Sequence, residues 1–203
     1  ATTSIIRPKY WHRMWAPVVI AICAGVGQRM EAAGPMKIWP APKAEPVCEY
    51  YSLRVNGQPV SVYSCRVSAV PLNQVWPGYQ RPLDQTELAG FAHWDMARPV
   101  KVEGIAKRPF KNVVVRPGSR AIHPTVRGQR ITFTLAKPGQ VTVELDGPHH
   151  ALHLFADPPE IDAPEPDRAG VRYFGPGSHR PGKIQLKSDE TLYVAGGAVV
   201  YTA

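Results

Sequence analysis

Prolines recur along almost the whole chain, and they set the strongest limit on its fold. The sequence has 22 prolines and 17 glycines among 203 residues, where an ordinary protein has about 5% proline. Proline removes a helical hydrogen bond and clashes with the preceding turn, so long helices are largely excluded. Because 44% of the residues are hydrophobic and only 20% are charged, the chain can still build a core. The sequence therefore predicts an all-β protein with many turns.

The segment between Cys48 and Cys65 is predicted to be a β-hairpin. Apolar residues alternate on both sides of Asn56-Gly57, a strong hairpin signal because both central residues need positive φ. Extended outward, this register places Cys48 opposite Cys65 on a non-hydrogen-bonded pair, where side chains approach most closely. We expect a Cys48–Cys65 disulfide in an exported protein. The alternative is two free, half-buried thiols, and the spacing does not match a zinc site.

The rest of the first three quarters of the chain predicts a β-sandwich. Short apolar runs recur between turns at intervals of about ten residues, as in sandwich folds. The expected strands are 87–94, 100–105, 111–116, 125–135, 140–145 and 150–155. The runs at 125–135 and 140–145 are expected to pair as a second hairpin through Lys137-Pro138-Gly139. The sandwich would span 48–156, after a proline-rich lead-in at 34–47.

The sequence pattern changes after an acidic, proline-rich linker at 157–170. Very short strands are expected at 171–174, 183–186, 191–194 and from 198 onward, separated by glycine-containing turns. Tiny strands with tight turns are typical of the first rung of a β-solenoid, which needs about three or more rungs to bury a continuous core. Because the sequence stops within an expected strand, we expect more protein to follow Ala203.

The first 33 residues are predicted to be an export signal. Arg7, Lys9 and Arg13 precede an apolar run at 16–26 that is too short to span a bilayer, and Ala32-Ala33 offers small residues for cleavage. The alternative is a buried helix or strand of the fold. We expect a secreted or periplasmic protein with no membrane span in the mature chain.

The formal net charge of +8 allows nucleic acid, an anionic membrane or an acidic polysaccharide as partners. The basic residues are scattered, however, and are not interleaved with aromatic residues as in an RNA-binding sheet. A solvated basic surface is favoured, and we expect no nucleic-acid partner.

Several segments in the second half of the chain occur in a familiar order. They are Lys111–Ser119, His123–Gly128, Ile131–Gln140, Leu152–Pro159, Tyr173–His179 and Leu192–Tyr201. Together they resemble the N-terminal β-sandwich and first β-helix rung of dextranase-like family 49 and polygalacturonase-like family 28 glycoside hydrolases. The resemblance implies an antiparallel β-sandwich followed by the start of a right-handed parallel β-helix. It also implies a polysaccharide substrate and a C-terminal β-helix domain as the partners of this chain.

The resemblance transfers no catalytic residue. Glycoside hydrolysis needs two carboxyl groups about 5–9.5 Å apart, and in these families they are aspartates on middle rungs of the helix. This chain lacks the Asp-Asp, Asn-x-Asp and Gly-His-Gly motifs, and its Arg-x-Lys, Arg7-Pro8-Lys9, lies in the expected signal. We therefore expect a non-catalytic module of a glycoside hydrolase. The alternative is a stand-alone secreted carbohydrate-binding module.

Aromatic residues are the candidate carbohydrate contacts, because apolar sugar faces pack on aromatic rings. Trp76 and Tyr79 lie in an expected loop, where binding residues concentrate. Trp94 is a third candidate, although core packing is favoured for it if it lies on the inner face of its strand. For Phe91, core packing is favoured.

The sequence predicts no metal site and no cofactor. His149, His150 and His153 have a ligand-like spacing, but His150 and His153 would point to opposite faces of a strand. The acidic residues of 157–167 could surround calcium, yet prolines interleave them, which favours a solvated linker. Glu144 and Asp146 read as the end of a strand rather than as a catalytic pair.

Overall fold

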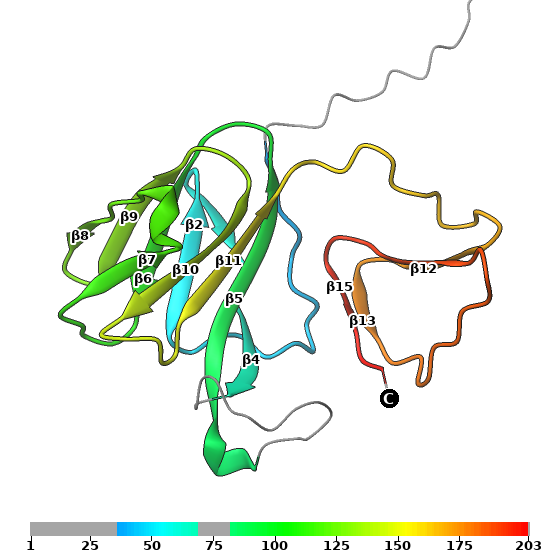
Figure 1. Ribbon diagram of the computed structural model, residues 1–203, viewed down its shortest axis with the longest axis horizontal. Coiled ribbons are helices and arrows are strands. Elements are labelled where there is room, and N and C mark those ends of the chain that lie inside the picture. Colours follow the sequence, from blue (N-terminus) through cyan, green and yellow to red (C-terminus); the bar gives the residue numbers. More distant parts are fainter. Residues whose placement is uncertain (1–35, 69–81, 203) are drawn as a thin grey trace, which may run out of the picture. The chain divides into compact units, whose positions relative to one another are not determined.

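The computed structural model describes residues 36–68 and 82–202 (Figure 1). The expected signal at 1–33 and the loop aromatics Trp76 and Tyr79 lie outside the described residues. The described residues form strands and two short 3-10 turns, η1 (Leu83–Gln85) and η2 (Gly118–Arg120), and they contain no α-helix. The predicted all-β class is confirmed.

Two β-sheets form the layers of a sandwich, seen one behind the other in Figure 1. The five-stranded sheet has the order β3-β2-β6-β9-β8. Its strands are β2 (Tyr51–Val55), β3 (Gln58–Val60), β6 (Val100–Ala106), β8 (Thr125–Arg127) and β9 (Arg130–Leu135). All of its neighbouring strands are antiparallel.

The six-stranded sheet is built around the longest strand, β5. Its order is β1-β5-β11-β10-β7, and β4 also pairs with β5. Its strands are β1 (Met36–Lys37), β4 (Tyr63–Ser68), β5 (Thr86–Met96), β7 (Val113–Arg116), β10 (Gly139–Leu145) and β11 (Leu152–Asp157). The β5–β11 pair is parallel and the other pairs are antiparallel, so the sheet is mixed.

Alternation along the strands places the core between the two sheets. β2 buries every second residue, and so do the later parts of β5 and β10. Because side chains alternate between the faces of a strand, each strand gives one apolar row to the core. Burial of a large apolar side chain is worth about 1.5–3 kcal/mol. The largest fully buried side chains are Trp94, Met96, Ile131, Leu135, Leu152 and Leu154.

The predicted hairpin is confirmed at its tip. Asn56 and Gly57 have φ values of 48° and 79°, and β2 pairs with β3 in the predicted register, with Leu53 beside Val60. Asn56 also stabilises the turn through its side chain, whose oxygen accepts a hydrogen bond of 2.8 Å from the Lys101 N–H of β6.

The predicted register is wrong farther from the turn. After Val60 the chain leaves the five-stranded sheet, and β4 pairs with β5 of the other sheet, as at sandwich corners where strands switch sheets. Cys48 is fully buried in the core, whereas Cys65 lies beside Ala89 and lines the outer face of the six-stranded sheet. Both cysteines are free, and the expected Cys48–Cys65 disulfide is not formed in this structure.

The predicted second hairpin is also wrong. β9 and β10 belong to different sheets, so the turn at Lys137-Pro138-Gly139 carries the chain across the sandwich. The hairpin lies instead within 125–135, where β8 and β9 turn at Gly128 with a φ of 60°. Arg120 from η2 holds the crossover by donating a hydrogen bond of 2.9 Å to the Pro138 carbonyl.

The last part of the described chain forms two successive coils. Its strands are β12 (Val171–Phe174), β13 (Gly177–His179), β14 (Thr191–Val194) and β15 (Ala198–Val200). β12 pairs in parallel with β14, and β13 pairs in parallel with β15 (Figure 1). Strands that return in parallel, each beside its counterpart one coil earlier, start a parallel β-helix. The expected strand at 183–186 is not formed.

Candidate functional site

The outer face of the six-stranded sheet carries two rows of aromatic side chains. In the first row, Phe91 of β5 lies between Tyr63 of β4 and His153 of β11. In the next row, His93 of β5 lies beside Phe155 of β11. The rows share a face because residues two apart on a strand point the same way. The Tyr63 and Phe91 rings stack with their centroids 5.1 Å apart.

A groove of about 650 Å³ lies over these rows. Its lining includes Phe91, His93, Gln140, His153, Phe155 and Asp157. Cys65 and Val67 of the edge strand β4 complete it. Gln140 and Asp157 are exposed, whereas the phenylalanines and histidines are half-buried. We call this surface the aromatic groove, and it combines apolar rings with a few polar groups, as ligand sites do.

The floor of the aromatic groove is uncharged at neutral pH. Burial lowers the pKa of His93 and of His153 below the ordinary value of 6.5. Nδ1 of His153 lies 3.0 Å from the Thr142 hydroxyl, which orients the ring. Burial also raises the pKa of the Cys65 thiol, so this cysteine is protonated and a weak nucleophile.

A pair of aspartates follows the aromatic rows. Asp95 of β5 lies beside Asp157 of β11 in the parallel ladder. Burial, reinforced by the charge of Asp157, raises the pKa of Asp95 to about 6. Lys37 on β1 lies on the other side of Asp95 and opposes this shift. Asp95, in the row beyond the groove, thus holds its proton more tightly than an ordinary aspartate.

A second group of residues joins the coils to the sandwich. Glu45 of the proline-rich lead-in is only 8% exposed. Its carboxylate accepts hydrogen bonds of 2.5 Å from the Ser178 hydroxyl and 2.5 Å from the Tyr201 hydroxyl. Ser178 lies on β13 of the first coil, and Tyr201 directly follows β15 of the second. These two bonds lower the pKa of Glu45 despite its burial.

Trp39 makes the second contact of this junction. Its ring lies against Gly196 and Gly197, so a Cβ atom at Gly196 would overlap the indole, and one at Gly197 would lie 2.9 Å from the Cβ of Trp39. Gly197 also has a φ of 81°, which side chains rarely adopt. On its other side Trp39 packs on His93, with ring centroids 5.5 Å apart. The Trp39 indole therefore leaves no room for a side chain at Gly196 or Gly197.

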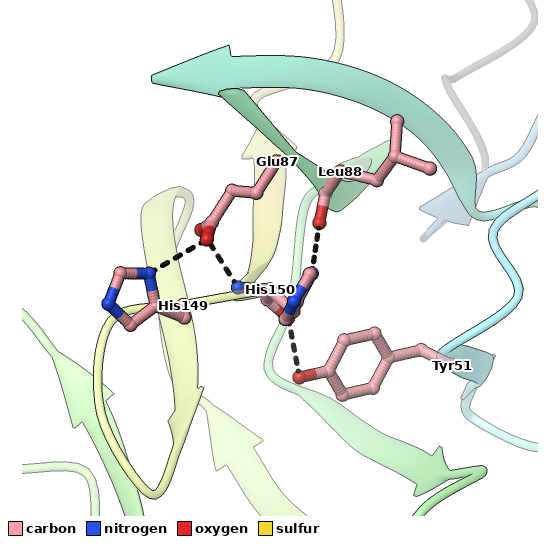
Figure 2. Close-up of polar contacts among 5 residues, drawn as sticks. All are labelled: Tyr51, Glu87, Leu88, His149 and His150. Atoms are coloured by element: carbon pink, nitrogen blue, oxygen red, sulfur yellow. Dashed lines mark hydrogen bonds and ion pairs between the residues drawn. The ribbon is translucent and has the colours of Figure 1, made fainter. Parts of the chain in front are cut away.

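The histidines of the β10–β11 loop form a clamp rather than a metal site (Figure 2). Glu87 of β5 accepts hydrogen bonds of 2.7 Å from the His149 ring and 3.0 Å from the His150 N–H. Burial opposes ionisation of Glu87, but these bonds outweigh it and lower its pKa. His150 donates from Nδ1 to the Leu88 carbonyl at 2.8 Å.

Tyr51 extends this clamp to the other sheet. Its hydroxyl donates a hydrogen bond of 2.9 Å to the His150 carbonyl (Figure 2), and burial raises its pKa to about 12. His153 lies elsewhere, on the aromatic groove. Within residues 36–68 and 82–202, no group of three or more His, Cys, Asp and Glu could hold a metal ion.

Trp94, a carbohydrate candidate from the sequence, takes the core position that was its alternative. It lies on the inner face of β5 and is fully buried, so the core alternative holds. Phe91, three residues earlier on the outer face of β5, lines the aromatic groove, so the core placement favoured for it is wrong. Trp76 and Tyr79 lie outside the described residues, so their assignment stays a prediction.

Glu144, Asp146 and Glu160, among the remaining sequence candidates, have structural partners. Glu144 pairs with Arg116 across β10 and β7 at 3.2 Å. Asp146 accepts hydrogen bonds from the Lys111 and Asn112 N–H groups at 2.9 and 2.7 Å. In the linker, Glu160 accepts a hydrogen bond from the Tyr193 hydroxyl of β14. The sequence did not indicate this contact.

The fold was compared with known proteins. No family model and no curated protein matches the chain. Among solved structures, Dex49A from Penicillium minioluteum has a similar fold, with a TM-score of 0.58 and 17% sequence identity. The match covers 82% of this chain and 44% of Dex49A, so the chain spans less than half the length of that protein. At this identity the likeness establishes the fold.

In the described part of the chain, no helix is long and apolar enough to cross a membrane.

Proposed function

We propose that this chain is the N-terminal, non-catalytic part of a secreted polysaccharide-degrading glycoside hydrolase. One observation carries the proposal: the chain leaves a β-sandwich and enters two parallel coils, in a fold that it shares with the dextranase Dex49A. In this reading a longer β-helix follows the two coils and hydrolyses the glycosidic bond. The sandwich anchors the first coils of that helix.

The junction residues support the anchoring role. Glu45 accepts hydrogen bonds from side chains of two successive coils, and Trp39 packs against the turn before β15. Each repeat of a solenoid contacts only its neighbours, and the terminal repeats need special capping. The lead-in thus joins the weakest repeats of the solenoid to a domain with a closed core.

The coils offer no acid and base for hydrolysis. The acidic residues within 171–202 are Asp189 and Glu190, adjacent in a turn. Glu190 accepts a hydrogen bond of 2.9 Å from the Lys187 N–H, and Asp189 has a φ of 67°. Both therefore serve the turn geometry. A glycosidase needs two carboxyl groups that flank the scissile bond, and we assign them to later coils.

The test compares the 203-residue chain with the whole protein that we propose, in reducing-sugar assays on dextran and on polygalacturonate. We expect the whole protein to release sugar from one polymer and the 203-residue chain to release none. Hydrolysis by the 203-residue chain would overturn the proposal, and would direct attention to Asp95 and Asp157. A coding sequence with no further coils after Ala203 would also overturn it.

Export is the second part of the proposal, and it rests on the basic residues and apolar run of the first 33 residues. Mass spectrometry of the protein recovered outside the producing cell tests whether it is exported and where it is cleaved. Loss of the segment up to about Ala33 is expected. A protein retained inside the cell with Ala1–Ala33 intact would contradict export.

A further inference from the structure

We propose that the aromatic groove on the outer face of the six-stranded sheet binds an uncharged saccharide chain. This inference goes beyond the anchoring role, and it rests on the proposed function only for the class of ligand, a polysaccharide. The site would hold substrate on the sandwich, away from the hydrolytic carboxyl groups.

The arrangement of the rings suits a saccharide. Phe91 and Phe155 lie on adjacent parallel strands, in successive rows, so their rings offer two apolar patches along one groove. The apolar face of a sugar ring packs on such rings. The volume of about 650 Å³ falls within the ordinary range of about 300–1,000 Å³ for ligand sites.

The polar groups of the groove suit hydroxyl ligands. Gln140 on β10 lies beside Phe155, and Asp157 follows Phe155 by two residues on the same face. The Gln140 amide both donates and accepts, and the Asp157 carboxylate accepts, so together they can bind hydroxyl groups that do both. His153 adds a neutral imidazole whose Nδ1 is already engaged by Thr142.

Charge identifies the ligand as uncharged. The eight lining residues include no lysine or arginine, and the charged group among them at neutral pH is the Asp157 carboxylate. An acidic sugar would find no cation to pair with and one carboxylate that repels it. The outer face of the other sheet differs, because Lys101, Arg127 and Arg130 line a separate depression there, together with Glu103, which pairs with Arg130 at 2.6 Å. A polyanion would prefer that face.

The experiment measures binding of the 203-residue chain to dextran, a neutral glucan, and to polygalacturonate by affinity electrophoresis at low and high salt. We expect dextran to retard the chain equally at both salt concentrations, because no ion pair forms. Retardation by polygalacturonate, if any, should disappear at high salt. Phe155→Ala should weaken dextran binding about fivefold to tenfold.

Matched variants separate the groove from general effects. Phe174→Ala replaces a half-buried phenylalanine of β12, outside the groove, and should leave dextran binding unchanged. Gln140→Ala changes an exposed residue, so it tests the groove even if Phe155→Ala fails to fold, and it should weaken binding about threefold. Asp157→Lys should increase polygalacturonate binding more than Asp84→Lys, which changes charge equally at an exposed site outside the groove.

Two results would overturn saccharide binding at the groove, and a third would overturn the inferred charge of the ligand. One is no dextran binding by the folded chain, and the other is binding that survives both Phe155→Ala and Gln140→Ala. A preference for polygalacturonate that resists high salt would also contradict the assignment of an uncharged ligand. These outcomes differ from failure of the proposed function, because hydrolysis by the whole protein is measured separately and does not require this groove.

Discussion

The sandwich and the two coils are both made of short strands, but they bury very different amounts of apolar surface. The core cluster comes entirely from residues 48–156 and includes Trp94, Met96 and Leu154. Among the described residues of the coils, the buried hydrophobic side chain is Ala195, at 9% exposure, while Leu192 and Val194 are 38% and 47% exposed. The strands alone therefore do not make a core; a second packed layer does.

This difference assigns different sources of stability to the two regions. The sandwich closes its core between its own sheets, so each sheet covers the other. The coils have no such partner layer within the described residues and depend on their neighbours, as solenoid repeats do. Among the described residues, the lead-in contacts the coils through Glu45 and Trp39.

The largest effect is expected for a leucine of the sandwich core. Leu154→Ala should lower the free energy of unfolding by about 2–5 kcal/mol, since it removes a fully buried side chain and leaves a cavity. Leu192→Ala, the matched change in β14, should cost about 0.5 kcal/mol or less, because Leu192 is partly exposed. Urea unfolding followed by tryptophan fluorescence measures both, and equal losses would refute the division.

Glu45→Ala should open the coils without unfolding the sandwich. It removes the acceptor of two hydrogen bonds, and hydrogen bonds to charged groups are worth about 1.5–3 kcal/mol each. Hydrogen exchange should become at least tenfold faster at the amides of β14 and β15, while the amides of β5 and β11 stay protected. Glu49→Ala, an exposed glutamate nearby in sequence, is the control. Equal acceleration throughout the chain would contradict a local anchor.

The same contact should make the coils sensitive to acid. The folded-state pKa of Glu45 lies below its ordinary value because Ser178 and Tyr201 donate to the carboxylate. Its stabilisation is therefore fully present above the unfolded pKa of 4.5 and is lost as the pH falls through the folded-state pKa. Tyr63 and Arg180 also lie near this group: the charge of Arg180 favours the Glu45 carboxylate, and burial raises the pKa of Tyr63. Protection factors, which correct for the slower intrinsic exchange in acid, should thus fall at β15 at a higher pH than at β5.

Local signals predicted much of the fold, and they failed where a strand changed sheets. Asn56-Gly57 determines its turn through local backbone conformation, so the register next to it was correct. The position of Cys65 depends on β4 leaving that ladder for β5, which involves residues distant in sequence. Alternation predicted the strands of 125–145, but alternation does not say which sheet a strand joins.

The candidate sites were largely missed, because both depend on pairing between distant segments. The groove joins Phe91-x-His93 to His153-x-Phe155, and the parallel β5–β11 pairing cannot be inferred from either segment. In both segments an aromatic residue and a histidine lie two positions apart, and this shared spacing was the signal that could have indicated a common face. Glu45 is a single carboxylate in a proline-rich segment, and nothing local marks it as buried.

A smaller effect, of the opposite sign, is expected at the end of the groove. Asp95→Asn should stabilise the sandwich at pH 7 by about 1 kcal/mol or less, since partial exposure lets solvent screen the repulsion. The folded chain holds the Asp95 proton up to about pH 6, while the unfolded chain releases it near 3.8. The contribution of Asp95 to wild-type stability should therefore fall as the pH rises from about 4 to 6. Asp157, Glu160 and Lys37 are the charges that set this shift.

Urea unfolding of both proteins at pH 4 and pH 7 measures this prediction. The difference between wild type and Asp95→Asn should be near zero at pH 4 and should favour the variant at pH 7. A variant that is less stable at pH 7 would show that the Asp95 carboxylate makes a favourable contact, with Lys37 as its partner.

The smallest effect is expected for His149 of the clamp, and the clamp also separates two carboxylates that look alike, Glu87 and Glu45. His149→Ala should change the free energy of unfolding by about 0.5 kcal/mol or less, because the His149 side chain is 59% exposed and exposed ion pairs contribute little. Glu87→Ala should cost about 1–2 kcal/mol, because it also leaves the His150 N–H without its acceptor.

Glu87 and Glu45 both accept two hydrogen bonds, but Glu87 joins strands that already share a core, whereas Glu45 joins a region that has none. Substitution of Glu87 should therefore shift the unfolding midpoint of the whole sandwich slightly and leave hydrogen exchange in the coils unchanged. If Glu87→Ala instead accelerated exchange in β14 and β15 as much as Glu45→Ala does, the coils would depend on the sandwich as a whole rather than on the lead-in. The two variants, measured side by side, decide between these dependences.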